Sequence, residues 1–100
     1  MRKYELKTKN TNQKSFYGKA VVTVYNPDFV VLTSYKTDVA AIIDGEFVRL
    51  WGGWSATTAK HVHEFLLQNG FKPINKAEWL KLPVIALNDA DYIFQIAKGA

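Results

Sequence analysis

The sequence predicts an α+β fold, with an antiparallel four- to five-stranded β-meander in the N-terminal half followed by two or three helices packed on one face. Apolar and polar residues alternate through roughly the first fifty positions, which is typical of half-buried strands. Near residue 54 the apolar period changes to about 3.6, which is typical of helices. With 100 residues, 48% of them hydrophobic, we expect a single domain over 1–100, with a core over 14–82 and a helical tail over about 88–98.

The strands and their turns can be placed in order. Strands are predicted over residues 4–8, 16–25, 29–35, 39–43 and 47–51. Asn26-Pro27-Asp28 predicts the turn between the second and third runs, because proline fixes φ and the flanking side chains bond nearby backbone. Asp44-Gly45 predicts a two-residue hairpin with positive φ at both positions.

A helix is predicted over residues 56–69. Ser55 or Thr57 can cap its first turn. One apolar stripe at helical spacing consists of Thr58, Val62, Phe65 and Leu66. Gly70 is placed to end the helix in a left-handed conformation, with Phe71 folding back onto Leu66.

Two shorter helices are predicted after this one. Asn75 and Glu78 form a capping-box pattern that opens a helix carrying Trp79 and ending before Pro83. Asn88 can cap the helical tail. The apolar stripe of this tail consists of Ala90, Ile93, Phe94 and Ala97.

Composition excludes several classes of protein. The chain has no cysteine, so disulfides and thiolate zinc sites are excluded, and no cofactor is expected. Its N-terminus is charged where a signal peptide would be apolar, and no run is long enough to span a membrane. We therefore expect a cytoplasmic protein that has no membrane partner.

The segment from Trp51 to His61 is the most informative stretch for function. It joins a strand to a helix N-terminus through Gly52-Gly53 and offers hydroxyl, ammonium and imidazole groups beside free backbone N–H groups. Such an end can receive a phosphate or a carboxylate, although the same residues also serve plain capping and core packing. The candidate site for a protein or an anion consists of Trp51, Trp54, Ser55, Thr57, Thr58, Lys60 and His61.

The histidines do not form a recognisable metal or catalytic site. His61 and His63 point about 200° apart on a helix, so they cannot grip one metal ion. Ser55 lies six residues before His61, beyond easy hydrogen-bond reach for a catalytic arrangement with Glu64. No metal site, no catalytic residue and no enzymatic activity are therefore expected.

The basic charge is concentrated near the N-terminus. The chain carries a net charge of +4, and residues 1–19 hold six basic residues against one acidic residue. Such a patch can attract phosphate backbone, and exposed aromatic rings would let bases stack, although lysines also commonly protect an edge strand. The candidate nucleic-acid-binding residues are Lys7, Lys14, Tyr17, Lys19 and Arg49.

Four segments resemble a family of short uncharacterised proteins from phages, plasmids and other mobile elements of Gram-positive and gut bacteria. The segments are Lys14-Ser15-Phe16-Tyr17-Gly18-Lys19-Ala20, Ser34-Tyr35-Lys36-Thr37-Asp38-Val39-Ala40, Leu50-Trp51-Gly52-Gly53-Trp54-Ser55-Ala56-Thr57-Thr58 and Lys60-His61-Val62-His63-Glu64-Phe65. The resemblance covers about residues 14–80 and implies a domain of unknown function in a bacterial host. It supplies a genetic setting and no mechanism.

Together these observations predict a non-enzymatic binding module. In the setting that the resemblance implies, the expected partner is a protein of the host or of the element, including a host defence nuclease such as a CRISPR effector. The alternative is a nucleic-acid-binding accessory protein that uses the basic N-terminal strands. A mimic of DNA is disfavoured because nine acidic residues face thirteen basic ones.

Overall fold

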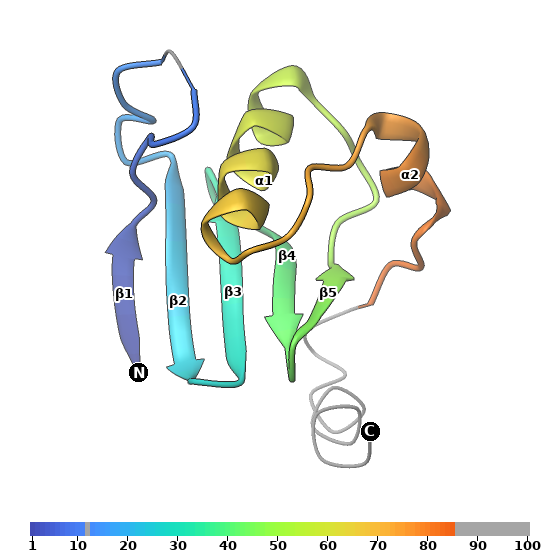
Figure 1. Ribbon diagram of the computed structural model, residues 1–100, viewed down its shortest axis with the longest axis horizontal. Helices are drawn as coiled ribbons and strands as arrows, with labels where there is room; N and C mark the ends of the chain where they lie inside the picture. Colours follow the sequence, from blue (N-terminus) through green and yellow to red (C-terminus); the bar gives the residue numbers. More distant parts are fainter. Residues whose placement is uncertain (12, 86–100) are drawn as a thin grey trace.

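Five strands are followed by two helices (Figure 1). The computed structural model describes residues 1–11 and 13–85. The strands are β1 (Arg2–Glu5), β2 (Ala20–Asn26), β3 (Phe29–Ser34), β4 (Thr37–Ile43) and β5 (Glu46–Arg49), and the helices are α1 (Ala56–Gln68) and α2 (Lys76–Lys81). The predicted α+β class is confirmed, with five strands.

The sheet is a meander in which each strand pairs antiparallel with the next, in the order β1-β2-β3-β4-β5. Both predicted turns are present. The backbone N–H of Asp28 donates to Asn26 Oδ1 at 2.8 Å, and Asp44 and Gly45 have φ values of 50° and 80°. These short turns keep β2 paired with β3 and β4 paired with β5.

The second strand begins later than the alternation predicts. Tyr17 and Gly18 have φ values of 53° and 74° and form a turn that the Lys19 N–H closes by donating to the Phe16 carbonyl at 2.9 Å. The alternation of apolar residues along the sequence extends through this turn, because Phe16, on its N-terminal side, is buried like the apolar residues of the strand. Strand β2 consequently starts at Ala20, four residues after the predicted start.

The ends of both helices follow the predicted signals. Ser55 caps α1, because its Oγ accepts from the Thr58 N–H at 3.1 Å. At the other end Gly70 has a φ of 82°, and the Phe71 N–H donates to the Leu66 carbonyl at 2.9 Å. The left-handed Gly70 and the bond from Phe71 form the Schellman motif that the sequence predicts at the end of α1.

Helix α2 begins with the predicted capping box. The Glu78 N–H donates to Asn75 Oδ1 at 2.8 Å, and the Asn75 N–H donates to Glu78 Oε1 at 3.1 Å. The helix ends at Lys81, before Pro83. The predicted helical tail over about 88–98 lies outside the described residues.

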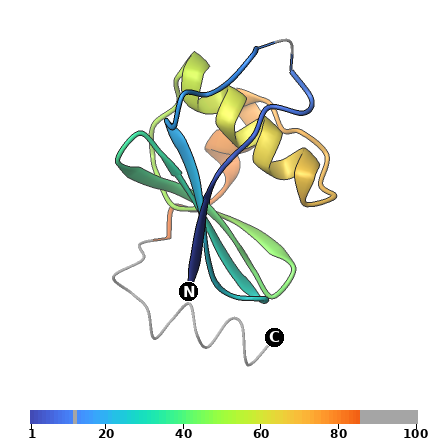
Figure 2. The same cartoon turned by 90° about the vertical axis from the view of Figure 1, so that its left-hand side faces the viewer.

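The main core lies between one face of the sheet and the two helices, which Figure 2 shows on the same side of the sheet. Trp79 from α2 is fully buried there. The rest of this core consists of Leu6, Phe16, Ala20, Val22, Leu32, Val39, Ala40, Val62, Phe65 and Leu66. A second buried cluster consists of Val31, Ala41, Ile43 and Val48. Within the described ranges, neither helix has the length and apolar character that a membrane span requires.

Candidate functional site

The two tryptophans of the predicted site pack into the main core. Trp51 and Trp54 are half-buried. The Trp54 ring lies 5.8 Å from the ring of Trp79, centroid to centroid. A Cβ at Gly53 would clash with the Trp51 indole, and the Gly53 carbonyl accepts from Trp79 Nε1 at 2.8 Å. Gly53 therefore serves close packing of this loop against the core.

Arg49 is inside the protein and apart from the exposed lysines with which the nucleic-acid hypothesis grouped it. Its side chain donates to the carbonyls of Trp51 at 2.9 Å, Gly52 at 2.7 Å and Leu82 at 2.9 Å. Its guanidinium carbon also lies 5.3 Å from the centre of the Trp79 ring. Since only 5% of Arg49 is exposed, this residue fastens the loop after β5 to the end of α2, and no phosphate can reach it.

Thr58 and His61 also point inward. Ser34 Oγ lies 2.8 Å from His61 Nδ1 and 3.1 Å from Thr58 Oγ1, so the three side chains form a buried polar chain between β3 and α1. The His61 ring contacts the rings of Phe16 and Tyr35, with centroids 4.6 and 5.9 Å apart. Burial lowers the pKa of the His61 imidazole from its usual value of 6.5, because desolvation disfavours the charged form.

The other groups considered for a catalytic or metal site have separate partners. His63 Nε2 lies 2.8 Å from the Ile74 carbonyl oxygen. Ser55 Oγ accepts the capping hydrogen bond from the Thr58 N–H. The Glu64 carboxylate accepts hydrogen bonds from the loop before β2. Among residues 1–11 and 13–85, no group of three or more His, Asp or Glu side chains is placed to hold a metal ion.

Glu64 holds this loop in place. Its Oε1 accepts from the N–H groups of Lys9 at 2.9 Å and Asn10 at 2.7 Å, and its Oε2 accepts from Asn10 Nδ2 at 2.7 Å and Gln68 Nε2 at 2.8 Å. Desolvation acts to raise the pKa of the Glu64 carboxyl, but hydrogen bonds from Asn10, Gln68 and Lys9 outweigh it and hold that pKa below 4.5. Nothing local in the sequence indicates this contact, because 54 residues separate Asn10 from Glu64.

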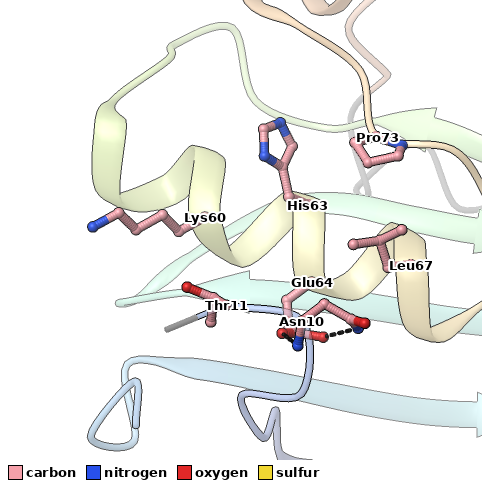
Figure 3. Close-up of a pocket in the computed structure, with 7 residues that line it drawn as sticks. All are labelled: Asn10, Thr11, Lys60, His63, Glu64, Leu67 and Pro73. Atoms are coloured by element: carbon pink, nitrogen blue, oxygen red, sulfur yellow. Dashed lines mark hydrogen bonds between the residues drawn. The ribbon is translucent and has the colours of Figure 1, made fainter. Parts of the chain in front are cut away.

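A pocket of about 300 Å³ lies beside Glu64 (Figure 3). Figure 3 shows Glu64 directed toward Asn10, while Lys60 extends away from the other lining residues. The remaining residues that line the pocket are Thr11, His63, Leu67 and Pro73. The Glu64 carboxylate already accepts four hydrogen bonds from the protein, so it has little capacity left to bind a ligand.

Exposed tyrosine and lysine side chains lie instead at one end of the sheet. This end, the upper one in Figure 1, brings together the loop before β2, the turn between β3 and β4, and the first turns of α1. Tyr17 and Tyr35 are 72% and 52% exposed there. We call this surface the tyrosine end and define it by Tyr17, Lys19, Tyr35, Lys36 and Lys60, all of which are exposed.

The backbone holds both tyrosines firmly. Tyr17 and Tyr35 have φ values of 53° and 58°, in the left-handed region that bulky side chains rarely adopt. The Tyr17 N–H donates to Ser15 Oγ at 2.9 Å, and the Tyr35 N–H donates to the Lys19 carbonyl at 2.6 Å. Lys19 Nζ lies 5.5 Å from the centre of the Tyr35 ring. The turn conformation thus projects two large rings into solvent beside a cation.

Three further residues of the two predicted sites are exposed, namely Thr57, Lys14 and Lys7. Thr57 and Lys14 are exposed, and the Lys14 carbonyl accepts from Thr8 Oγ1 at 2.9 Å. Lys7 is exposed and lies 3.5 Å from a carboxylate oxygen of Glu5. The structure therefore places the loop with Tyr17 and Lys19 at the same end of the sheet as the first turns of α1, which carry Lys60, although the sequence predicted them for two separate sites (Figure 1). The sequence does not indicate Lys36 as a site residue, because nothing in its turn distinguishes it from a solvated lysine.

Comparison with known proteins gives a family match. A family of unknown function (DUF8033) matches residues 4–81, from within β1 to the last residue of α2. No curated protein matches the chain. No solved structure matches it either. Because the match covers more than half of the sequence, the chain belongs to the DUF8033 family, a family of unknown function.

Proposed function

We propose that this protein is a non-enzymatic binding module whose tyrosine end engages another protein. The observation that carries the proposal is the pair Tyr17 and Tyr35, exposed at 72% and 52% and held at positive φ. A strained backbone at an exposed aromatic residue motivates a functional reading, since glycine or asparagine would fill the same turn at lower cost. Tyrosine is also enriched among the residues that dominate binding energy at protein interfaces.

Preorganisation supports the same proposal. Hydrogen bonds to the backbone fix the turns that carry both tyrosines, and a tyrosine side chain has only two rotatable angles to order on binding. Fixing an anchor before binding reduces the entropy lost in the complex. The surrounding Lys19, Lys36 and Lys60 favour an acidic surface on the partner.

The resemblance to proteins of phages and other mobile elements suggests where the partner is found. In that setting the protein acts in the cytoplasm of a bacterial host and binds a protein of the host or of the element. A host defence nuclease, such as a CRISPR effector, is the first candidate, because a stoichiometric inhibitor needs only a complementary surface. The basic tyrosine end would contact an acidic part of such a nuclease and not its basic nucleic-acid groove.

Affinity capture in the bacterial host tests the proposal. We expect the double variant Tyr17→Ala, Tyr35→Ala to recover its partner about tenfold less well than the native chain, which corresponds to about 1.4 kcal/mol. Tyr25→Ala is the matched control, because Tyr25 is 45% exposed and lies at the opposite end of β2. Equal recovery with the native chain and the double variant would contradict the proposal.

Nucleic acid is the second candidate partner. Lys7, Lys14 and Lys19 are exposed near Tyr17 along the chain, and Lys19 lies over the Tyr35 ring, so rings for base stacking adjoin cations for phosphates. Titration with labelled single- and double-stranded oligonucleotides at two salt concentrations separates the candidates. Binding that weakens steeply with salt supports this second function, and no binding at low salt removes it.

A further inference from the structure

Strand β1 forms one edge of the sheet, and the described residues leave that edge open. Among residues 1–11 and 13–85, β1 stands first in the strand order and pairs with β2 alone. The opposite edge, at β5, is met by the chain after α2, since the Ile85 N–H donates to the Arg49 carbonyl at 2.9 Å. Figure 2 looks onto the β1 side, where this strand lies in front of the rest of the sheet. An open edge of this kind can accept a further strand.

The backbone groups of Lys3 and Glu5 point to the open edge. The Leu6 N–H donates to the Ala20 carbonyl at 2.9 Å, and β1 pairs with β2 from Glu5 back to Arg2 without a shift in register. In an antiparallel pair, successive residues direct their N–H and C=O groups alternately toward and away from the neighbouring strand. Leu6 directs these groups toward β2, so Glu5 and Lys3 direct theirs away from it. Each therefore offers a donor and an acceptor to an incoming strand.

The side chains of the same two residues carry opposite charges. Positions 3 and 5 are two apart on a strand, so both side chains project from the same face of the sheet. Lys3 is exposed. The Glu5 side chain is 35% exposed, its Oε1 accepts from the Gly18 N–H at 3.0 Å, and its Oε2 lies 3.5 Å from Lys7 Nζ. These contacts hold the carboxylate beside the edge and leave it lone pairs for a further cation.

We propose that β1 pairs antiparallel with β1 of a second copy of this chain, with Tyr4 facing Tyr4 of that copy. A contact between identical edges is self-complementary, so the two strands must be symmetric about one residue. With Tyr4 at the centre, Lys3 lies opposite Glu5 of the second copy, and Glu5 lies opposite its Lys3. Both are pairs of opposite charge, and each exchanges two backbone hydrogen bonds because the edge-facing groups belong to these residues. Centring on Lys3 or on Glu5 would place like charges opposite each other.

This inference goes beyond the proposed function, because it assigns another part of the surface and another occupant. Lysines on an edge strand commonly hinder pairing, and Lys3 does so in every register that faces it with a second lysine. The register centred on Tyr4 turns the same lysine into a partner for Glu5. Since β1 has four residues, we expect a weak and reversible pair that joins the two sheets edge to edge.

Single cysteines test the register, because the chain has no cysteine of its own. In the proposed pair the two Cα atoms at position 4 lie about 4.5 Å apart, within reach of a disulfide, whereas the two positions 3 are diagonal neighbours about 7–8 Å apart. Under mild oxidation we expect Tyr4→Cys to form a disulfide-linked dimer at least about tenfold faster than Lys3→Cys. Equal rates, or faster linkage in Lys3→Cys, would overturn the proposal.

Charge exchange provides a second readout by sedimentation velocity of the purified full-length chain from micromolar to millimolar concentration. We expect the native chain to self-associate and Lys3→Glu or Glu5→Lys alone to weaken association at least about tenfold, since each places like charges opposite each other. A mixture of the two variants restores association, because both facing pairs are then of opposite charge. Lys72→Glu, at an exposed position outside the strands, is the matched control and leaves association unchanged.

Two results of this measurement count against the paired edge. One is a native chain that stays monomeric at millimolar concentration. The other is a mixture that associates no better than its components when both variants keep the native circular dichroism spectrum. Neither result bears on the tyrosine end, since no second protein is present in the sample.

Discussion

At the scale of single residues, the buried polar chain of Thr58, Ser34 and His61 determines how α1 sits on the sheet. These side chains are 5%, 2% and 1% exposed, so each lost hydrogen bond leaves a polar atom without water to replace its partner. The sequence predicts a binding role for Thr58 and His61, because hydroxyl and imidazole groups beside the start of a helix are typical of a ligand site. Their true partner, Ser34, lies 24 residues before Thr58 and could be identified only from the fold.

Removing the central hydroxyl tests this reading. We expect Ser34→Ala to lower the free energy of unfolding by about 1–3 kcal/mol, since His61 Nδ1 and Thr58 Oγ1 both lose a buried partner. Thr57→Ala, which removes an exposed hydroxyl from the same helix turn, should change it by less than about 0.5 kcal/mol. Chemical denaturation measures both, and equal small effects would contradict the structural role.

The buried imidazole also predicts how stability depends on pH. Burial lowers the pKa of His61 in the folded chain below the value of 6.5 expected when unfolded. As pH falls through 6.5 the unfolded chain binds a proton that the folded chain resists, so the free energy of unfolding decreases. Glu64 contributes at lower pH, because its depressed pKa supplies stability above 4.5 that is lost as pH falls further.

Denaturation at pH values between about 7.5 and about 5.5 covers the range in which histidine usually takes up a proton. We expect the free energy of unfolding of the native chain to decrease across this range. We expect a flatter profile in His61→Leu, which cannot take up the proton. Equal slopes in the two proteins would show that another group controls this transition.

At the scale of elements, local signals predicted the helix ends and turns well. Ser55, Gly70, Asn75 and Asp44-Gly45 act as the sequence predicts, because capping and tight turns depend on neighbouring residues. The start of β2 was misplaced because the turn at Tyr17 interrupts a continuing apolar pattern. A tyrosine at positive φ violates the local preference on which the prediction relied.

Two glycines allow a controlled test of the end of α1. Gly70 has a φ of 82°, so Gly70→Ala should lower the free energy of unfolding by about 1–2 kcal/mol even though its Cβ would meet open space. Gly52→Ala should cost nothing measurable, because φ there is not left-handed and the nearest atom, Val84 Cγ2, is 4.0 Å away. Thermal melts compare the two, and a larger loss at Gly52 would contradict this account of the helix stop.

At the scale of the whole molecule, the fold class was predictable and the surface was not. Periodicity and turn residues determine a meander followed by helices, but which aromatic rings face solvent depends on long-range packing. Trp51 and Trp54 are half-buried because they pack against the main core, where the Trp54 ring contacts Trp79 from α2. Arg49 is buried because its side chain donates to three carbonyl groups in the loop after β5 and at the end of α2. The tyrosine end emerges only when three separate segments converge (Figure 1).

Site-specific photo-crosslinking in host cells tests the central claim most directly. A photoreactive phenylalanine analogue would replace Tyr35 in one chain and Tyr25, at the opposite end of the sheet, in another. The account predicts a discrete crosslinked protein partner from position 35 and none from position 25. A partner captured from position 25 and not from position 35 would place the binding surface elsewhere and contradict the account.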